Sequence, residues 1–570
     1  MTDEKQPRGN ALLLATAFAF AAFMLFAKLG VFPLAQPDEG RNAEVAREMC
    51  VSGSWLVPTL DGLPYLDKPA FFFKCSALCF SAFGVTEGAA RLPSALFALA
   101  TILISWAFVR RAFGARAAAL AVAIMATAPL FVALARIVIM DMTLTFFVIA
   151  AILCGAMAEE FDGRRRTMWI VTGAVMSGLA TIVKGPVGFV VPLVVLIPWH
   201  IVEKRRGTVK RIFGWLPLAT FWLVALPWFL LLCRARPDFA HYGLVEETFR
   251  RYTTGAMKRE QPWYFYATIV FAGFAVWSLL LPEGIAAAWR GRAKLSRFDR
   301  LGIVWCIAVV GFFSLSKSKQ PAYILSIATP MAFLVARIFD AAISNRQGSA
   351  ARMIRRATVL LGALLLALCV ALVVAQPATL GRWFHAAPNT MALMMPLIGP
   401  LRVALLALGV LAFAGFFLRS AKTSFVFFAA ILPVLVVCGF KNIAAYTAHR
   451  SAQDLVAGVE KYSAGADVAC LQIYPSALPF YLGRTITLFT DDAGETGSNY
   501  IIYTLKKSNP WPAPMVKIAD LDRWLASRTN AVFLLTGKNR RDDIEKIAAS
   551  RGVAPAWLTT DYIGVKLPPP

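Results

Sequence analysis

Acidic and basic side chains that could catalyse group transfer are concentrated in residues 36–69, directly after the first long apolar run. This segment begins with the adjacent acids Asp38 and Glu39, followed by Arg41. If a helix begins there, Asp38, which follows a proline, occupies the position typical of a helix cap. If the preceding apolar run spans a membrane, an acidic pair at its end is costly unless it is used, so we expect Asp38 to be functional.

The same predicted helix places two further acids, Glu44 and Glu48, four residues apart on one face. Charged residues on a helix usually face the solvent. We therefore interpret Arg47 and Glu48 as parts of a solvated helix face and not as catalytic groups.

A second group of candidates lies at the end of the segment, where Tyr65, Asp67 and Lys68 occur within four residues. A lysine beside an aspartate at a membrane surface can bind a phosphate while the carboxylate binds a metal or another cation. The pair therefore predicts an anion site, with Asp67 as a candidate metal ligand.

Other charged or phenolic side chains occur where later apolar runs begin or end. Arginine at such a position commonly extends to lipid head groups, which is our interpretation of Arg91 and Arg136. Asp141 lies within an apolar stretch, which favours a function. Carboxylates alone would indicate a cation pathway, whereas their mixture with Lys, Arg and Tyr favours a lipid-phosphate substrate and group transfer. The remaining candidates are Lys184, residues 246–252, Lys317, Lys319 and Tyr323.

The elements that would position these residues are membrane-spanning helices. The 570 residues are 58% hydrophobic, with a mean hydropathy of +0.62, and soluble chains are about 45–50% apolar. The first apolar run, 11–32, is long enough to be retained as a helix and lacks a convincing cleavage site. About thirteen spans are predicted, at 11–31, 91–109, 118–135, 142–158, 168–183, 186–202, 212–233, 264–286, 301–316, 321–338, 357–376, 400–418 and 425–441.

The distribution of basic residues predicts the orientation of these spans. Lys and Arg exceed Asp and Glu by 58 to 33, a net charge of +25, but the basic residues cluster in every second loop between apolar runs. This pattern is typical of cytoplasmic loops and not of nucleic-acid binding. It predicts a cytoplasmic N-terminus, an outer C-terminus, and a short interfacial helix at 71–83. The candidate residues named above then lie at the outer face.

The composition changes to that of a soluble domain at about residue 447. Runs 468–474, 485–489, 501–505 and 531–535 read as strands, and 518–527 and 541–551 as helices. We therefore expect a transmembrane domain over 1–446, with a first outer loop at 32–90, and a small α/β domain over 447–570. No nucleotide-binding motif is found, so no nucleotide cofactor is expected.

The outer-face motifs resemble those of a known family. The runs 38–49, 53–58, 65–69 and 84–93 resemble the bacterial GT-C glycosyltransferases of the protein mannosyltransferase-like superfamily, and among these the lipid A aminoarabinose transferases. The resemblance continues through residues 141–142, 184–186, 262–266 and 317–323 and covers most of the chain. It implies a polytopic α-helical GT-C protein of the bacterial inner membrane, with its small α/β domain in the periplasm.

The resemblance also implies an activity: transfer of a sugar from undecaprenyl phosphate to an acceptor at the periplasmic face. The sugar would be 4-amino-4-deoxy-L-arabinose and the acceptor a lipid A phosphate. By resemblance, Asp38 is the catalytic acid, Asp141 a second active-site acid, and Lys68 both a catalytic and a phosphate-binding residue. Further candidates around the carrier phosphate are Arg41, Tyr65 and Tyr323, with Glu39, Arg91, Lys184, Lys317 and Lys319 beside them.

Two positions depart from the family pattern. Asp67 stands where the aminoarabinose transferases carry Glu, which keeps the charge and shortens the reach. Thr248 stands where they carry a metal-binding His, and threonine is a poor zinc ligand. The divalent metal that the family uses is therefore an open question for this chain, as is the sugar.

Three alternatives follow from the residues. The first is the transfer of another polyprenyl-phosphate sugar to a lipopolysaccharide core, a glycan or a protein hydroxyl. The second is a transporter of lipid-linked substrates, although no inverted repeat is found. The third is an outer binding domain with a membrane anchor, for which thirteen spans are far more than anchoring needs.

Overall fold

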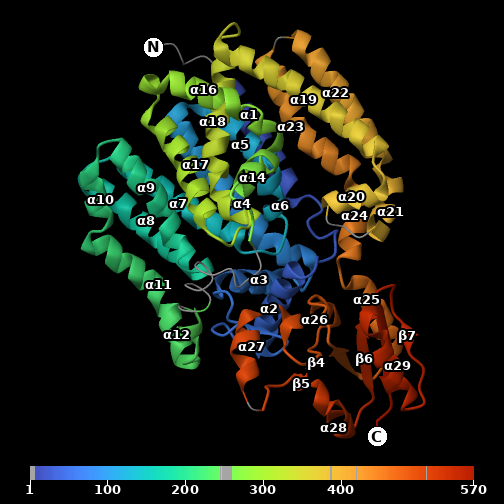
Figure 1. The fold of residues 1–570 in the computed structure, drawn as a ribbon. Coiled ribbons are helices and arrows are strands. Elements are labelled where there is room, and N and C mark those ends of the chain that lie inside the picture. The colour runs from blue at the N-terminus through green and yellow to red at the C-terminus, as the bar shows by residue number, and fades with distance from the viewer. Residues whose placement is uncertain are drawn as a thin grey trace. The chain divides into compact units, whose positions relative to one another are not determined.

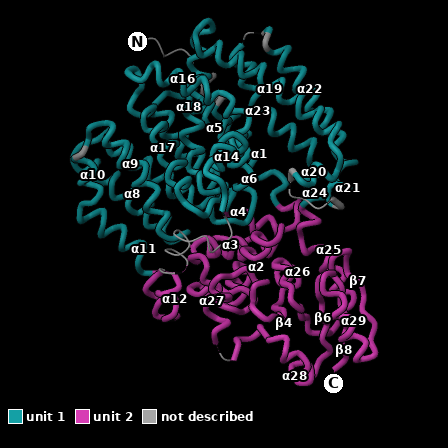
Figure 2. Tube along the Cα trace, in the orientation of Figure 1, with its two compact units in different colours: residues 1–29, 94–227, 251–446 teal, residues 30–93, 228–250, 447–570 magenta. Residues whose placement is uncertain are grey.

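The computed structural model describes residues 7–243, 246, 260–384, 388–418, 420–508 and 510–569. The chain divides into two compact units, coloured separately in Figure 2. The first unit comprises residues 1–29, 94–227 and 251–446, and the second comprises 30–93, 228–250 and 447–570. The second unit thus combines the first loop, a segment near residue 240 and the C-terminal part of the chain.

The first unit is built from helices (Figure 1). Helix α7 (Asp141–Ala158) is almost entirely buried and packs against α8 (Gly163–Lys184) and α9 (Val187–Val202). The other long helices are α1 (Pro7–Phe26), α4 (Glu87–Phe113), α11 (Trp215–Ala235), α17 (Arg297–Leu315), α18 (Ala328–Ser344), α19 (Ser349–Val374), α22 (Gly399–Leu418) and α23 (Ala421–Cys438). Shorter helices connect them: α5 (Ala115–Ala126), α6 (Pro129–Ala135), α10 (Arg206–Ile212), α14 (Phe265–Gly273), α15 (Ala275–Ser278), α16 (Leu281–Arg290), α20 (Pro377–Phe384), α21 (Pro388–Met394) and α24 (Phe440–His449).

All thirteen predicted spans fall on a helix or on a group of consecutive helices. Within the described residues, nine helices are long and apolar enough to cross a membrane, or up to eleven if each of two bent pairs counts as one span. The pair α5 and α6 bends by 65°, where Pro129 disfavours a helical conformation for the residue before it. The run 264–286 is broken more sharply, with a bend of 113° between α14 and the helices that follow.

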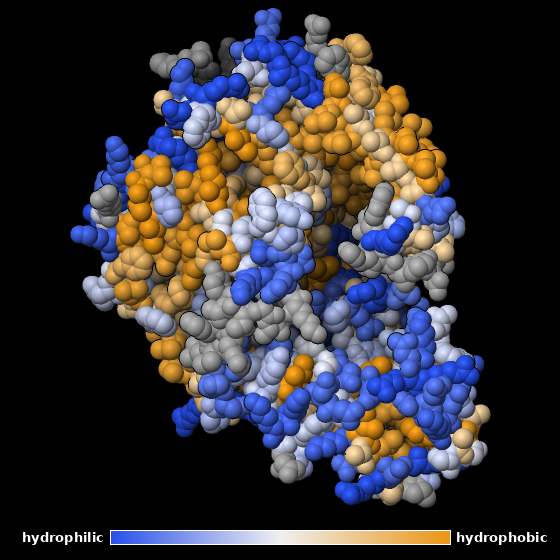
Figure 3. Space-filling view, in the orientation of Figure 1, coloured by the Kyte–Doolittle hydropathy of each residue, from blue (hydrophilic) through white to orange (hydrophobic). Residues whose placement is uncertain are grey.

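Large apolar side chains are exposed on the outer helices of the first unit, as the hydrophobic areas over α19 and α22 in Figure 3 show. Val374 on α19 and Val403 on α22 are 74% and 68% exposed, and Leu223 on α11 is 75% exposed. Water-soluble proteins rarely expose contiguous apolar surface of this kind. These helices therefore face lipid.

The C-terminal part of the second unit contains a six-stranded mixed sheet in the order β5-β4-β3-β6-β8-β7. The four neighbouring strands β5, β4, β3 and β6 are parallel, while β8 is antiparallel to β6 and β7. Helices α28 and α29 contribute Leu521 and Ile544 to a core with Phe489 of the sheet. The strands are β3 (Asp467–Leu471), β4 (Thr487–Thr490), β5 (Met515–Lys517), β6 (Val532–Gly537), β7 (Ala556–Trp557) and β8 (Tyr562–Leu567), and the helices are α25 (Gln453–Ser463), α26 (Leu478–Leu482), α27 (Asn499–Tyr503), α28 (Leu521–Ala526) and α29 (Arg541–Ala549).

The predicted strand at 501–505 is wrong, because these residues belong to α27 and a following helical turn. The Ser498 hydroxyl caps this helix by accepting a hydrogen bond from the Ile501 amide at 3.4 Å, and a serine cap favours a helix over a strand. The predicted strands at 468–474, 485–489 and 531–535 coincide with β3, β4 and β6. Strands β5, β7 and β8 were not predicted.

The first loop folds into helix α2 (Asp38–Ser52), a hairpin of β1 (Thr59–Leu60) and β2 (Leu63–Pro64), and helix α3 (Phe71–Phe83). Helix α2 packs against α3, β1 and α26. The predicted helix at 71–83 is therefore present. All nine cysteines are free thiols, so Cys50 and Cys470 do not form a disulfide.

Candidate active site

Asp38 is the first residue of α2 and does not cap it. The cap residue is Pro37, and no side chain makes a capping hydrogen bond. Instead, the Asp38 carboxylate accepts a hydrogen bond from the Arg41 guanidinium, one helical turn later, at 2.5 Å. The Asp38 side chain is 56% exposed and that of Arg41 13%. The carboxylate is therefore held in place by Arg41 while most of its surface stays accessible.

Glu39, the neighbouring acid, has a different role. It is buried, and its carboxylate accepts hydrogen bonds from Arg91 Nε at 2.8 Å and Nη2 at 2.9 Å. Arg91 also donates to the carbonyl oxygens of Phe32 and Pro33, and Glu39 accepts from the Ala35 amide. The pair fixes the chain that enters α2, so interpreting Arg91 as a ligand of lipid head groups was wrong.

Tyr65, Lys68 and Arg41 are the residues predicted to lie around the carrier phosphate, and all three belong to the second unit. The Arg41 guanidinium lies 6.0 Å from the centre of the Tyr65 ring, and Tyr65 is buried. The pKa of Arg41 is raised by Tyr65, Asp38 and Asp67, so Arg41 keeps its charge. Its Nε is buried without a hydrogen-bond partner in the described part of the chain. Lys68 is half-buried, and its Nζ donates to the Asp67 carbonyl oxygen at 2.6 Å. Two cations and a phenol thus lie where an anion could bind.

The Asp67 carboxylate is occupied by protein donors. Oδ1 accepts from the Tyr242 hydroxyl at 2.7 Å and from the Tyr500 amide at 2.8 Å, and Oδ2 accepts from the Asn499 amide at 2.9 Å. A carboxylate that accepts three hydrogen bonds has little capacity left for a cation. The geometry therefore favours a structural role for Asp67 over metal binding.

A buried acidic cluster lies farther along α2. Arg47 forms two hydrogen bonds to Glu44, at 2.6 and 2.7 Å, and Glu48 accepts from the Gly62 amide at 3.1 Å. Asp61 accepts from the Ile486 amide at 2.8 Å. All four side chains are buried, so interpreting Arg47 and Glu48 as a solvated face was wrong. These four charged side chains form hydrogen bonds within the second unit instead of facing water.

The first unit contains a second candidate cluster at the N-terminus of α7. Lys184 Nζ lies 2.5 Å from Asp141 Oδ1, and their side chains are only 11% and 4% exposed. The same Nζ lies 5.4 Å from the centre of the Tyr323 ring, a cation–π distance. The structure thus brings together three residues that lie far apart in the sequence.

The other basic candidates of this unit have separate positions. Lys319 is buried and donates to the carbonyl oxygens of Ser316 and Gln261, which gives it a structural role. Lys317 is exposed. Arg136 donates to the carbonyl oxygens of Met24, Leu25 and Ala27 at the end of α1, so it does not extend to head groups.

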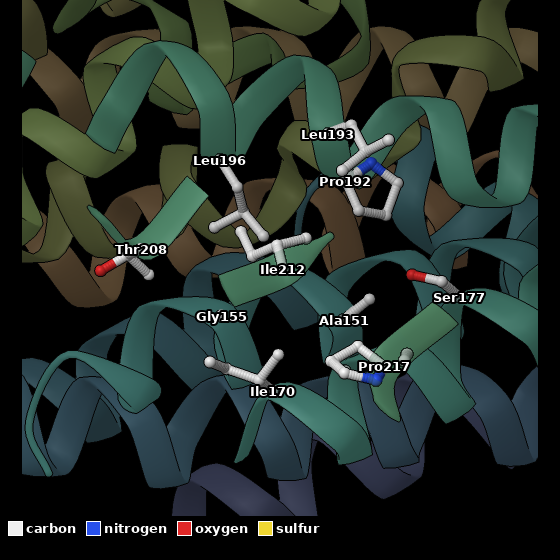
Figure 4. Close-up of a pocket in the computed structure, with 12 residues that line it drawn as sticks. Ala151, Gly155, Ile170, Ser177, Pro192, Leu193, Leu196, Thr208, Ile212 and Pro217 are labelled. Carbon is white, nitrogen blue, oxygen red and sulfur yellow. The ribbon is translucent and has the colours of Figure 1, made fainter. Parts of the chain in front are cut away.

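Figure 4 shows a pocket formed by residues of α7, α8, α9, α10 and α11. Its lining contains no ionisable side chain, and Ser177 and Thr208 contribute its only hydroxyl groups. The pocket is therefore suited to hydrocarbon and not to phosphate chemistry. The lining residues are Ala151, Gly155, Ile170, Gly173, Ala174, Ser177, Pro192, Leu193, Leu196, Thr208, Ile212 and Pro217.

The segment 247–252, which includes Thr248 at the position of the family's histidine, lies outside the described residues. Among the residues that are described, no group of three or more His, Cys, Asp or Glu side chains could hold a metal ion. The predicted metal ligand Asp67 therefore belongs to no such group within the described part of the chain.

Comparisons with known proteins agree with this architecture. Residues 10–243 match the family model described as dolichyl-phosphate-mannose-protein mannosyltransferase. Two relatives, from Erwinia tasmaniensis and Proteus mirabilis, are named undecaprenyl phosphate-alpha-4-amino-4-deoxy-L-arabinose arabinosyl transferases. Each is 30% identical to this chain, over 56% and 59% of its length. The chain spans about 60% of the length of these relatives, the matched regions being 59% and 60% of them.

Solved structures extend the likeness over the whole fold. The structure of ArnT from Cupriavidus metallidurans bound to undecaprenyl phosphate superposes with a TM-score of 0.80, covering 98% of this chain and 97% of that one at 22% identity. The Archaeoglobus fulgidus oligosaccharyltransferase superposes with a TM-score of 0.51 over 95% of this chain and 70% of that one, at 11% identity. At these identities the superpositions establish the fold alone.

The superposition and the long apolar helices define the chain as a multi-pass membrane protein with the fold of these solved structures. Within that class, the matched family model, the curated relatives and the superposition all indicate a similarity to ArnT and to the aminoarabinose arabinosyl transferases.

Some contacts of the site have no signal in the sequence. The spacing of Asp38 and Arg41 indicates one helical turn, but the bonds from Asn499 and Tyr500 to Asp67 join residues more than 430 positions apart. Similarly, the contact between Arg41 and the Gly497 carbonyl, at 3.2 Å, follows from no pattern.

Proposed function

We propose that the chain is a glycosyltransferase that transfers a sugar from undecaprenyl phosphate to an acceptor at the outer face of the inner membrane. By resemblance, the reaction is the transfer of 4-amino-4-deoxy-L-arabinose to a lipid A phosphate. The observation that carries this proposal is the accessible Asp38 carboxylate held by Arg41, whose guanidinium also lies over the Tyr65 ring. The names of the relatives, which specify this donor and this sugar, support it.

In the proposed reaction, the bond between the anomeric carbon and the carrier phosphate breaks while a bond from an acceptor oxygen to that carbon forms. The bonding pair leaves with the phosphate, so negative charge increases on the phosphate oxygens in the transition state. Arg41 and Lys68 stabilise that charge, and Tyr65 can donate a hydrogen bond to it. Because phosphate is a good leaving group, the reaction needs mainly this charge stabilisation.

The role of Asp38 depends on the acceptor. A hydroxyl acceptor must lose its proton as it attacks, and Asp38 would take that proton as a general base. A lipid A phosphate is already ionised at neutral pH, so Asp38 would only position it and the donor. In either case the ion pair with Arg41 sets the orientation of the carboxylate before the substrate binds.

The cluster of Asp141, Lys184 and Tyr323 is proposed to supply a second active-site acid and a phenol for the carrier phosphate. Lys184 fixes the buried Asp141 carboxylate by their hydrogen bond. The exposed Lys317 remains a candidate for binding anionic substrates at this surface.

We also propose a topology. Thirteen crossings from a cytoplasmic N-terminus would place the first loop and the C-terminal α/β domain, residues 447–570, in the periplasm, where lipid A phosphates are accessible. The alternation of basic loops supports this orientation. Labelling Cys50 with a membrane-impermeant thiol reagent in intact spheroplasts would test it, and protection of Cys50 there would contradict it.

The metal used by similar transferases does not fit the described residues. Both oxygens of the Asp67 carboxylate accept hydrogen bonds from protein groups. No step of the proposed reaction is therefore assigned to a metal. Thr248 also argues against a divalent ion, because threonine is a poor zinc ligand.

The experiment that tests the proposed function is mass spectrometry of lipid A from cells with and without the gene. Lipid A phosphates that carry aminoarabinose only in the presence of the gene would support the proposal. Unmodified phosphates in both strains would favour another sugar or acceptor, an alternative that the departure at Thr248 keeps open. Turnover of a polyprenyl-phosphate sugar by the purified protein in detergent, where no transport is possible, would exclude the transporter alternative.

A further inference from the structure

Residues 497–500 of the C-terminal part contact two parts of the candidate phosphate site. One part is Arg41, and the other is Asp67, the residue before Lys68. The Gly497 carbonyl accepts a hydrogen bond from Arg41 Nη1 at 3.2 Å. The Asn499 and Tyr500 amides donate to the Asp67 carboxylate at 2.9 and 2.8 Å. All these residues belong to the second unit. We infer that segment 497–500 positions the residues that bind the carrier phosphate. This inference rests on the proposed function.

The contact at Gly497 places the Arg41 guanidinium. One Nη group of Arg41 donates to Asp38 and the other to the Gly497 carbonyl. The planar guanidinium is thereby held at two points, and its Nε has no hydrogen-bond partner among the described residues. A cation held in this way loses little conformational entropy when an anion binds, so preorganisation increases affinity.

The backbone at position 497 favours glycine. Its φ is +63°, in the left-handed region that side chains other than glycine rarely adopt. A Cβ atom added there would lie 2.9 Å from Arg41 Nη1. Because that atom is the far end of a flexible side chain, an alanine would displace the guanidinium and leave the backbone nearly unchanged.

The contacts with Asp67 act on the second part of the site, which carries Lys68. Asp67 precedes Lys68, whose Nζ bonds to the Asp67 carbonyl oxygen. Two backbone amides at the start of α27 and the Tyr242 hydroxyl together fix the Asp67 carboxylate. The backbone that carries Lys68 is therefore held by the same segment that holds Arg41.

Packing makes the segment itself rigid. The Tyr500 side chain is completely buried, and its hydroxyl donates to Asp238 and accepts from Arg236 at 2.7 Å. Ala493, Tyr500 and Ile501 also belong to one apolar cluster with Leu63 and Leu66 of the first loop. The segment therefore keeps its position relative to the first loop, as a positioning element must.

Gly497→Ala tests the inference, with Gly552→Ala as the matched control. Gly552 has nearly the same backbone conformation, φ +65°, and its added Cβ would meet no atom within 4 Å. Both variants therefore carry similar backbone strain, but only Gly497→Ala displaces Arg41. The measurement is the dissociation constant of undecaprenyl phosphate for the purified full-length protein in detergent. We expect about tenfold weaker binding in Gly497→Ala, the loss of one charge-assisted contact, and no change in Gly552→Ala.

A double variant separates positioning from general damage to the fold. If Gly497 acts through Arg41, adding Gly497→Ala to Arg41→Ala should weaken binding no further. Equal binding by Gly497→Ala and Gly552→Ala would overturn the inference, as would additive effects in the double variant. Wild-type protein that binds no undecaprenyl phosphate would instead overturn the proposed function, so the two failures are distinguishable.

Discussion

The Glu39 carboxylate accepts two hydrogen bonds from the Arg91 guanidinium, and the two side chains are only 7% and 4% exposed. The neighbouring Asp38 is more than half exposed and bonds to Arg41. Two adjacent acids of the same charge therefore have different tasks. One fixes the fold of the first loop, and the other is available to a substrate.

Removing Arg91 should destabilise the protein. In Arg91→Met the buried Glu39 carboxylate loses both charged hydrogen bonds, which we expect to lower the free energy of unfolding by about 3–5 kcal/mol. Thermal unfolding of the purified protein in detergent measures this. In the control, Arg540→Met, an exposed ion pair is lost, and the change should be below about 1 kcal/mol. Equal stability of the two variants would contradict the structural role of Arg91.

Removing Asp38 should abolish sugar transfer without unfolding the protein. The side chain is exposed and caps no helix, so Asp38→Ala should change the unfolding free energy by less than about 1 kcal/mol. Transfer from a polyprenyl-phosphate sugar is the measurement. Asp543→Ala, which removes an exposed acid from the first turn of α29, should retain full activity. Retained transfer in Asp38→Ala would remove Asp38 from the catalytic role.

Replacing the Asp67 carboxylate should weaken the site even without a metal. In Asp67→Asn, the amide NH2 faces at least one N–H or O–H donor, which leaves a buried donor unsatisfied and should cost about 1–3 kcal/mol of stability. Because the protein occupies both oxygens of Asp67, treatment of the wild type with EDTA should leave transfer unchanged. Loss of transfer in EDTA that zinc restores would show that a metal is needed.

The buried cluster on α2 should make stability depend on pH. Burial raises the pKa of Glu44 from 4.5 to about 7, although Arg47 opposes the shift, and it raises the pKa of Asp61 in the same direction. Between pH 4.5 and 7 the unfolded chain loses the Glu44 proton while the folded protein keeps it. The free energy of unfolding should therefore fall as the pH rises through this range, by about 3 kcal/mol for Glu44.

Glu44→Gln cannot ionise and should make this slope shallower, with Asp61 still contributing. Unfolding between pH 4.5 and 8 in detergent is the measurement, and Glu460→Gln, which alters an exposed acid of α25, is the control. Identical slopes in the two variants would show that Glu44 is not the titrating group.

Helices of the first unit could be predicted from composition, because an apolar run of about twenty residues satisfies its backbone in lipid only as a helix. The sharp break in the run 264–286 could not be predicted in this way. There Gly273 packs so closely against Leu130 that an added Cβ would lie 2.9 Å from it. This contact between distant segments leaves no mark on local hydropathy.

The contacts of the candidate site, too, could be predicted from the sequence only in part. Arg41 lies one helical turn from Asp38, and its pairing is implied by that spacing. The partner of Glu39 is 52 residues away and the donors to Asp67 are more than 430 away. Burial also could not be predicted locally. An arginine at the position of Arg47 in an amphipathic helix typically faces solvent, but here Arg47 donates a hydrogen bond to the Gly483 carbonyl oxygen in the C-terminal part of the second unit.

Variants of the pair Asp141 and Lys184 should separate the pair's effect on stability from its effect on activity. In Lys184→Met the buried Asp141 carboxylate loses its partner, which we expect to lower the free energy of unfolding by about 3–5 kcal/mol. Adding Asp141→Asn removes the unpaired charge and should recover most of that stability. Transfer should stay lost in the double variant, because the proposed second active-site acid is absent. Unfolding in detergent and transfer activity are measured on the same preparations, and a double variant that regains activity would show that the pair is structural alone.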